Sequence, residues 1–302
     1  MPARNSEMHE EQRSQATSDV NTTTQETVRD SHRGDVFIAK LESSNLKTVI
    51  RILKSISSKK IAHFHAVESG IKFIIQEPGR FQMTAYLAKE LFVQYDCRKG
   101  EVRFKVSLEN VLNSLQMFVG IHGQATTALF TYKGEGHALK IQIEESGFHT
   151  DCEIKTINVD ELVEVDFRHE DRLCRVICKS DCMRDAFQSI LFWPSTAVTI
   201  KMSNRAPYFT LETVSDQGTS AATISKDSDY IENFECPNDI RFGYRQLMIK
   251  QAQKALAISE KTSIRIDGRG VLLMQFMIRT EEEVTTFIEF GCVPHIDVDE
   301  HE

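Results

Sequence analysis

The clearest pattern of apolar and polar positions lies between Ser44 and Lys60, where apolar residues recur at steps of three and four. These apolar residues are Leu46, Val49, Ile50, Leu53 and Ile56. On a helix they share one face, so the stretch is predicted to be an amphipathic helix with that face buried. Lys47, Arg51 and Lys54 recur at the same steps and form a strip of like charges beside it. Either water screens such a strip or a polyanion lies against it, and the helix alone leaves both interpretations open.

Most of the remaining chain is predicted to form short β-strands, because apolar and polar residues alternate between turn residues. In the first half, strands are expected at residues 36–43, 61–67, 71–76, 81–88, 91–97, 101–106, 126–132, 138–143 and 148–155, with a second amphipathic helix starting at Ser107. In the second half, strands are expected at residues 162–167, 173–178, 197–202, 208–213, 219–224, 229–236, 239–244, 263–266, 271–279 and 285–292, with helices at 180–191 and up to Ala257.

The two halves repeat one order of elements: strand, helix, several strands, helix and three strands. A shift of about 137 residues lays Ser44 near Asp181. Self-similarity over so long a period predicts an internal duplication. The fold class is therefore predicted to be α+β, with two similar domains at residues 36–156 and 157–293. Each domain is expected to contain antiparallel sheet and two helices.

Composition limits the number of domains and the cellular compartment that are expected for this chain. The 302 residues, 41% of them hydrophobic, suffice for two domains with a real core. The chain contains no apolar run long enough for a membrane span and no apolar secretory segment at its start, so neither membrane insertion nor export is expected. Seven cysteines in such a chain predict reduced thiols in the cytosol or nucleus.

Charge is concentrated at the two ends of the chain. Residues 1–35 are rich in Ser, Thr, Gln and Glu and are predicted to form a disordered tail, and residues 294–302 form an acidic tail. These two segments hold most of the net charge of −8. The body between them is close to neutral, so a local cationic surface is compatible with the overall acidity.

Two further helices bear on the question of a polyanion partner. In the fourth helix, Lys250 and Lys254 are predicted to point outward together with glutamines. In the third helix, Arg184 points outward but lies among Asp181 and Asp185, which weakens its contribution. Cations of this kind contact phosphates without reading bases, so they suit sequence-independent contact with DNA.

Two spacings imitate metal sites. Cys174, Cys178 and Cys182 are separated by three residues each, but the first two would lie about 13 Å apart on a strand, too far to share one ion. Buried thiols are therefore expected there. His63 and His65 share one strand face, but no carboxylate in the same hairpin completes a ligand set. No metal and no cofactor is predicted.

Enzyme activity has weak support in the sequence. Asp151 and Glu153 form the one acidic pair on a strand that resembles a nuclease motif, but a two-metal nuclease needs several converging carboxylates. No glycine-rich phosphate loop of the Walker type is present, so ATP use is not expected. A basic helix lying on anionic lipid is a further alternative, which the short helix and surrounding strands disfavour.

Several strings resemble a known family. They are PYFTLET at residues 207–213, KDSD at 226–229, SIRIDGRG at 263–270 and MIR at 277–279. These strings resemble the Rad-one subunit family of the nine-one-one checkpoint clamp, which belongs to the proliferating cell nuclear antigen group of sliding clamps. The similarity covers residues 36–294 and leaves out both tails.

The resemblance implies an assembly. Clamp subunits have two domains, and three subunits close a ring with sheets outside and channel-lining helices inside, which face duplex DNA. The checkpoint clamp is a nuclear heterotrimer of unlike subunits that a dedicated clamp loader places on damaged DNA. It supports checkpoint kinase activators and tethers repair enzymes. Alternatives are a homotrimeric replication-type clamp and the metal-dependent 3'-5' exonuclease activity ascribed to some members.

The resemblance also implies roles for particular residues. The DNA-facing residues would be Lys47, Arg51, Lys54, Lys250, Lys254 and, with less support, Arg184. The subunit junctions would be edge strands that pair in antiparallel fashion, at residues 148–155 and 219–226. Their expected interface residues are Phe148, Thr150, Cys152, Ile154, Thr219, Ala221, Thr223 and Ser225.

Overall fold

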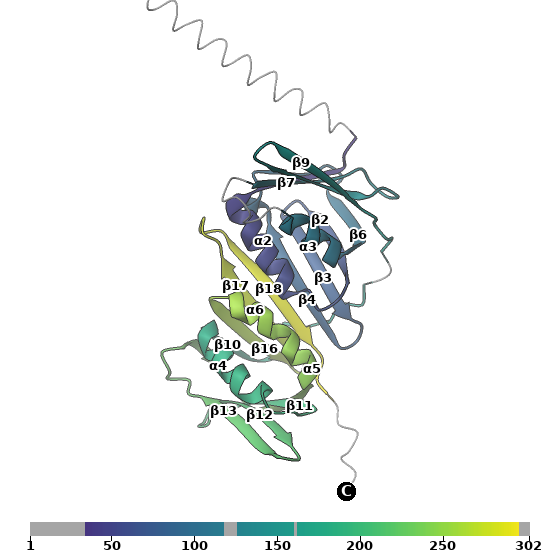
Figure 1. The fold of residues 1–302 in the computed structure, drawn as a ribbon. Helices are drawn as coiled ribbons and strands as arrows, with labels where there is room; N and C mark the ends of the chain where they lie inside the picture. The colour runs from purple at the N-terminus through teal and green to yellow at the C-terminus, as the bar shows by residue number, and fades with distance from the viewer. Residues whose placement is uncertain (1–33, 118–125, 160–161, 296–302) are drawn as a thin grey trace, which may run out of the picture.

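The computed structural model describes residues 34–117, 126–159 and 162–295. Within these ranges the strands form three antiparallel sheets, and the helices lie together on one side of them (Figure 1). The predictions of a disordered N-terminal tail and an acidic C-terminal tail fall largely outside the described residues, as do Phe118 and Val119 at the end of the second helix.

The structure contains strands where most were predicted. The first half holds β1 (Phe37–Glu42), α2 (Ser43–Ser55), β2 (Ile61–Val67), β3 (Gly70–Glu77), β4 (Phe81–Ala88), η1 (Lys89–Leu91), β5 (Gln94–Cys97), β6 (Glu101–Ser107), α3 (Leu108–Gln116), β7 (Thr126–Tyr132), β8 (Leu139–Glu145) and β9 (Phe148–Ile154). The second half holds β10 (Arg172–Lys179), α4 (Ser180–Leu191), β11 (Ala197–Met202), β12 (Phe209–Ser215), β13 (Gly218–Ile224), β14 (Ile231–Glu235), β15 (Ile240–Arg245), α5 (Gln246–Ile249), η2 (Lys250–Ala252), α6 (Gln253–Ile258), β16 (Lys261–Asp267), β17 (Leu272–Arg279) and β18 (Thr285–Cys292).

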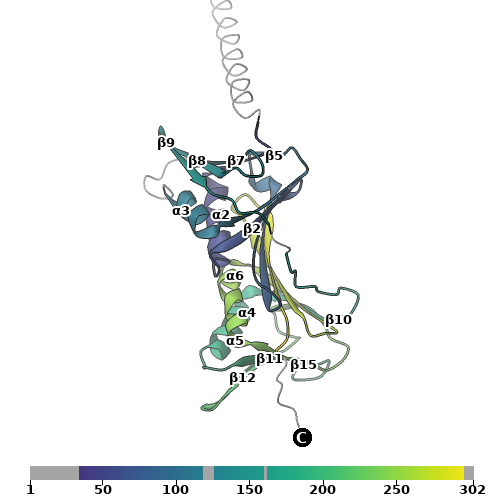
Figure 2. The same ribbon diagram turned by 90° about the vertical axis from the view of Figure 1, so that its right-hand side faces the viewer.

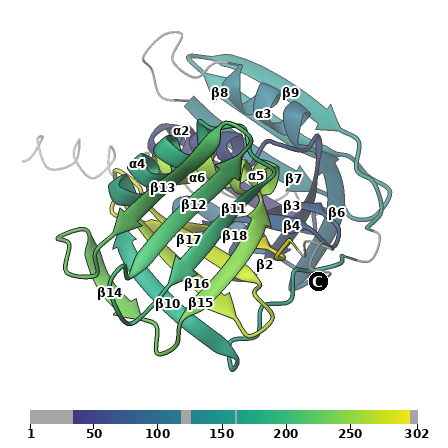
Figure 3. The ribbon, with the colours of Figure 1, turned by 90° about the horizontal axis from the view of Figure 1, so that it is seen from below.

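The halves repeat one topology. In the first, β5-β1-β7-β8-β9 form a sheet, and in the second the corresponding order is β14-β10-β16-β17-β18. Likewise β4-β3-β2-β6 corresponds to β13-β12-β11-β15 (Figure 3). The third residue after each last strand also pairs equivalently, since Ile157 bonds Lys105 on β6 and His295 bonds Gly243 on β15. The sequence prediction of a duplicated α+β architecture agrees with this repetition.

One sheet runs across both halves. Strand β18 pairs with β4, which joins five strands of the second half to four of the first in a nine-stranded sheet. Helix α2 packs against α3 of its own half and against α6 of the other. Turned by 90°, the molecule shows all these helices on one side of the long sheet (Figure 2). The sheet therefore has a helix-covered face and an outer face.

Burial explains the position of α2. The predicted apolar stripe is buried, with Leu46, Leu53 and Ile56 fully covered. Neither Ser43 nor Ser44 caps the helix with its side chain. The Ser43 hydroxyl bonds the Thr126 backbone instead. In α3 the predicted start is confirmed, because the Ser107 hydroxyl accepts a hydrogen bond from the Asn110 backbone N–H at 3.2 Å.

Two predicted elements are wrong or changed. Residues 162–167 form no strand. The connector's backbone N–H groups instead reach side chains of the sheet, as when Val165 donates to Gln82 Oε1 and Arg168 donates to Asp267 Oδ2. The expected fourth helix is interrupted by the 3-10 turn η2, which separates α5 from α6. Residues 162–167 alternate in polarity as a strand would, but a strand also needs a neighbouring strand edge to pair with, and alternation does not provide one.

Candidate nucleic-acid interface and subunit edges

The exposed face of α2 is entirely cationic between its ends. Lys47, Arg51 and Lys54 are exposed, while the residues between them are buried. None of the three has an ion pair among the described residues. Lys54 also lies in the last turn, where a cation is favoured by the helix dipole. The three cations that the sequence predicted to be exposed therefore lie, without an ion pair among the described residues, on the helix-covered side of the molecule.

Helix α3, which packs beside α2, exposes different chemistry. Its exposed residues are Glu109, Asn110 and Asn113, none of which is cationic. Asparagine amides can donate hydrogen bonds to phosphates, but without positive charge they add no electrostatic attraction. The cationic strip of α2 is thus a local feature of the helix layer.

The fourth helical segment adds a smaller contribution. Lys254 on α6 is exposed and Lys250 on η2 is half-buried. Neither forms an ion pair within the described part of the chain. Because α6 packs against α2, these lysines belong to the same helix layer as the cationic strip.

Arg184 on α4 has partners of its own. Its guanidinium donates to the carbonyl oxygens of Leu256, Ala257 and Ser259 at 3.1, 3.4 and 3.5 Å, at the C-terminal end of α6. It also forms an ion pair with Asp181. A cation that satisfies the last carbonyls of a helix stabilises that helix end. Arg184 therefore has fewer donors available for a ligand than the α2 cations have.

The two strands expected at subunit junctions both lie at sheet edges. Strand β9 ends the five-stranded sheet and β13 ends the four-stranded sheet. Both have the same sequence of exposed and covered positions along their seven residues. Phe148, at the start of β9, is 67% exposed. An uncovered edge exposes backbone groups that are available for a further strand.

The predicted interface residues fall on both faces of these edges. On β9, Thr150 and Cys152 are half-covered and Ile154 is buried, so they face the helices. On β13, the exposed residues Thr219, Ala221 and Thr223 face outward, and Ser225 follows the end of the strand. Backbone pairing at an edge involves residues of either face, so both sets remain predicted interface residues.

The junction inside the chain pairs the two strands that are equivalent to its free edge strands. Topologically, β9 corresponds to β18 and β13 corresponds to β4. In the molecule β18 and β4 pair in antiparallel register, with Phe287 opposite Tyr86. Their counterparts β9 and β13 have no such partner among the described strands. The duplication therefore leaves β9 and β13, the counterparts of the paired strands, at sheet edges.

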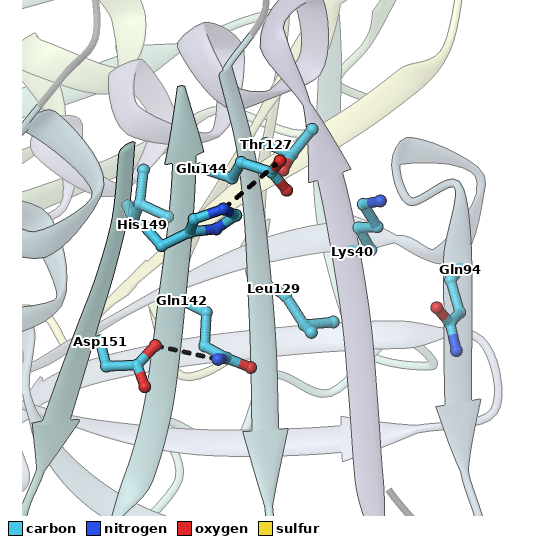
Figure 4. Close-up of a pocket in the computed structure, with 9 residues that line it drawn as sticks. Lys40, Gln94, Thr127, Leu129, Gln142, Glu144, His149 and Asp151 are labelled. Carbon is cyan, nitrogen blue, oxygen red and sulfur yellow. Dashed lines mark hydrogen bonds and ion pairs between the residues drawn. The ribbon is translucent and has the colours of Figure 1, made fainter. Parts of the chain in front are cut away.

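The acidic pair considered for hydrolysis is tied into the outer sheet face. Asp151 forms an ion pair with Lys140 at 2.7 Å and accepts a hydrogen bond from Gln142 at 2.9 Å (Figure 4). These two hydrogen bonds hold the pKa of the Asp151 carboxyl below its usual value. Across the described ranges, no group of three or more His, Cys, Asp or Glu side chains is arranged to hold a metal ion.

The other metal-like spacings have ordinary partners. His65 lies 2.6 Å from Glu101 on the neighbouring strand β6, and burial, followed by the charge of Arg103, lowers the pKa of His65. Burial raises the pKa of Cys174 and of Cys178 to about 12. All seven cysteines are free thiols in the structure, and the reduced state expected from the sequence stays a prediction.

A shallow apolar groove crosses the outer face where the halves join. Tyr86, Phe287 and Met277 lie opposite one another on adjacent strands and are half-buried. A cavity of about 180 Å³ opens beside Tyr86 and Phe287, and Lys72 Nζ lies 5.4 Å from the Tyr86 ring centroid. Sequence reasoning missed this groove. Its signal was the presence of three large apolar residues at outward positions of three different strands.

No helix in the described ranges is long and apolar enough to cross a membrane.

Comparison with known proteins identifies relatives over most of the chain. The family model described as repair protein Rad1/Rec1/Rad17 matches residues 36–278. The chain is 33% identical over 260 residues to the cell cycle checkpoint protein RAD1 of Homo sapiens, covering 85% of this chain and 92% of that protein. It is 26% identical over 276 residues to the DNA damage checkpoint control protein rad1 of Schizosaccharomyces pombe, covering 84% and 85%.

Solved structures share the fold at much lower identity. The proliferating cellular nuclear antigen of Entamoeba histolytica has a TM-score of 0.67 at 14% identity, covering 87% of this chain and all of the other. A chain of the PCNA2-PCNA3 complex of Sulfolobus tokodaii gives 0.66 at 14% identity, covering 85% and 99%. These likenesses show the clamp fold, as predicted. The chain therefore belongs to the Rad1/Rec1/Rad17 family of repair proteins, and the resemblance to a checkpoint clamp subunit drawn from its motifs is confirmed.

Proposed function

We propose that this checkpoint clamp subunit is one of three unlike subunits that close a ring around duplex DNA, with α2 facing the DNA. The observation that carries the proposal is the exposed face of α2, where Lys47, Arg51 and Lys54 have no ion pair within the described ranges. Like charges stacked along a helix repel one another, and a polyanion lying against them would remove that cost. Lys254 and the half-buried Lys250 extend the same positive surface. Arg184 is the weakest member because α6 already occupies its guanidinium.

Ring closure is proposed from the strand order. The β18–β4 pair joins the two halves of the chain, and β9 and β13 are the corresponding edges at its ends. Pairing of β9 with a neighbour's edge, and of β13 with that of the other neighbour, would repeat this junction around a ring. It would also cover two edges that are otherwise open to aggregation.

The expected mode of DNA binding is sequence-independent. Lysine and arginine contacts to phosphates attract and position DNA but carry no information about base sequence. A closed ring cannot leave the duplex sideways, so weak contacts suffice for retention and permit sliding. This behaviour suits a subunit that acts in the DNA damage checkpoint and in repair, and we propose that the protein acts in the nucleus.

Further partners follow from the same role. We propose that a dedicated clamp loader opens the ring and that repair enzymes and checkpoint kinase activators bind its outer surface. The groove beside Tyr86 and Phe287 suits an apolar side chain of such a client, since half-buried apolar residues with an adjoining cavity favour docking of this kind. Nothing in this role requires catalysis, and a non-catalytic scaffold is the expected state.

The test reverses charge on α2. Lys47→Glu combined with Arg51→Glu is expected to leave ring assembly intact on gel filtration and to weaken retention on circular duplex DNA by at least about tenfold at moderate salt. Lys99→Glu combined with Lys133→Glu is the matched control, since both lysines are exposed in turns of the first half. Unchanged retention, or equal loss in the control, would count against the proposal.

The exonuclease alternative is separated by a direct assay. Purified protein is incubated with end-labelled DNA and Mg²⁺ or Mn²⁺, and wild type is compared with Asp151→Ala. Digestion that disappears in the variant would favour the enzyme, whereas the scaffold predicts no protein-dependent digestion.

A further inference from the structure

The outer face of the second half carries two like-charged pairs across strands β10 and β16. Lys179 lies directly opposite Lys261, and Arg175 lies directly opposite Arg265. All four side chains point away from the helices, because the alternate residues of both strands are buried beneath them. Like charges placed directly opposite each other in a sheet are destabilising unless something neutralises them.

The lysine pair has partners within the chain. Lys261 Nζ lies 2.9 Å from a carboxylate oxygen of Glu232, and Lys179 Nζ lies 5.9 Å from the ring centroid of Tyr230. Nearby, Arg172 forms an ion pair with the carboxylate of Glu235, at a distance of 2.9 Å. Strand β14 and the turn before it therefore supply partners to three of the five cations on this surface.

The arginine pair lacks such partners. Arg175 is half-buried and has no ion pair or side-chain hydrogen bond among the described residues. Arg265 donates to Gln275 Oε1 at 3.1 Å, but its buried Nε has no hydrogen-bond partner. Burial lowers the pKa of Arg265, and the positive charges of Arg175 and Arg172 lower it further by a smaller amount.

One acid, Glu289, offsets this repulsion in part, since its charge raises the pKa of Arg265. Glu289 interacts electrostatically with Arg265 but forms no ion pair with it within the described ranges, and its carboxylate accepts a hydrogen bond from the Tyr86 hydroxyl at 3.5 Å. Burial raises the pKa of Glu289, which weakens its capacity as a counter-ion. Arg175 and Arg265 thus lie opposite each other on the outer face, each only partly covered, and the buried Nε–H of Arg265 has no partner among the described residues.

We propose that Arg175 and Arg265 form a phosphate-binding site on the outer surface, which takes a phosphorylated serine or threonine in an extended segment of a partner protein. Guanidinium groups match the oxygens of a phosphate in planar, charge-assisted pairs, and clusters of arginine recognise phosphorylated motifs in this way. A dianionic phosphate neutralises both arginines at once, which one carboxylate does not. The site lies on the face opposite the DNA-facing helices, so it is independent of the role proposed for α2.

The first test follows the arginine itself. Inorganic phosphate is titrated into the full-length chain at constant ionic strength while the Nε–H signal of Arg265 is recorded by nitrogen-proton NMR. A saturable shift is expected in wild type and at least about tenfold weaker binding in Arg175→Gln. Arg241→Gln, an exposed arginine on β15, is the control and is expected to behave as wild type. No saturable shift, or the same shift in Arg175→Gln, would overturn the site.

The second test identifies the source of the phosphate. A labelled Gly-Ser peptide with one phosphoserine is compared with the same peptide carrying serine or glutamate at that position. Preference for phosphoserine that disappears in Arg175→Gln and in Arg265→Gln supports the proposal. Equal binding of the glutamate peptide would replace it with a general acidic-peptide surface, and binding of inorganic phosphate alone would reduce it to an ion site.

Discussion

Helices α2 and α4 occupy equivalent places in the two halves, yet they expose opposite charge. Each follows the first strand of its half, begins at a serine and buries one apolar face. The exposed residues of α2 are lysine and arginine, whereas those of α4 include Asp181 and Asp185. The buried face is constrained by packing against the sheet. The exposed face is free to diverge, so it is where the two halves have acquired different roles.

One pair of equivalent cations makes the difference concrete. With the repeat of about 137 residues, Lys47 on α2 corresponds to Arg184 on α4. Lys47 is exposed and unpaired within the described ranges, while Arg184 is half-buried against the last carbonyls of α6. At this equivalent position, the side chain is therefore part of the exposed surface in the first half and part of the internal packing in the second half.

The largest expected effect tests what the two helices share. Leu53 and Ile190 are equivalent residues and both are fully buried. Leu53→Ala and Ile190→Ala are each expected to lower the free energy of unfolding by about 2–5 kcal/mol, through lost apolar burial and the cavity left behind. Urea unfolding followed by circular dichroism measures both. A cost well below this range for one of them would show that the two cores are not equivalent.

The next effect tests what distinguishes them. Arg184→Ala is expected to lower the free energy of unfolding by about 1–3 kcal/mol, because carbonyls at the end of α6 lose a charged donor, and to leave DNA retention nearly unchanged. Lys47→Ala is expected to do the reverse, reducing retention without changing stability. Thermal unfolding and retention on circular DNA are measured for both variants. Matching behaviour of the two would remove the distinction.

A gain of function sharpens the comparison. Gln188 on α4 is exposed and corresponds to Arg51 on α2. Gln188→Lys is expected to strengthen DNA retention and to steepen its dependence on the logarithm of salt concentration by about one unit, as one more phosphate contact forms. Gln188→Ala is the control for loss of the amide. An unchanged salt slope would indicate that α4 does not face the DNA.

The sequence predicts well those features that repeat locally. The stripe of Leu46, Leu53 and Ile56 defines α2, and alternation defines most strands, because burial of one face imposes a period on the residues of that same segment. Alternation also suggested a strand at residues 162–167, where no strand forms. There the backbone bonds side chains of the sheet instead, and no local pattern reports that choice.

Contacts between distant segments are what the sequence could not reveal. Arg184 appeared to be an outward cation, but its carbonyl partners lie 72 to 75 residues further along the chain. The groove of Tyr86 and Phe287 arises because β4 and β18 pair across the two halves. Such partners depend on tertiary pairing, which periodicity within one segment does not encode.

The smallest expected effect concerns the start of α2. Helix α4 has Asp181 in its own first turn, but α2 has no acid there. Glu282, in the turn between β17 and β18, takes that place by accepting hydrogen bonds from Ser44 Oγ at 2.5 Å and Asn45 Nδ2 at 3.0 Å. A carboxylate near a helix N-terminus is favoured by the dipole, and this one also links the two halves.

Replacing that carboxylate by an amide isolates its charge. Glu282→Gln keeps a carbonyl acceptor and is expected to lower the free energy of unfolding by only about 0.3–1 kcal/mol, since the residue is exposed. The loss should shrink at high salt, because screening weakens exposed charge interactions. Glu281→Gln, in the same turn, is the matched control. If both variants lose the same stability, or if salt has no influence, the N-terminal turn of α2 does not depend on a charge supplied by the other half.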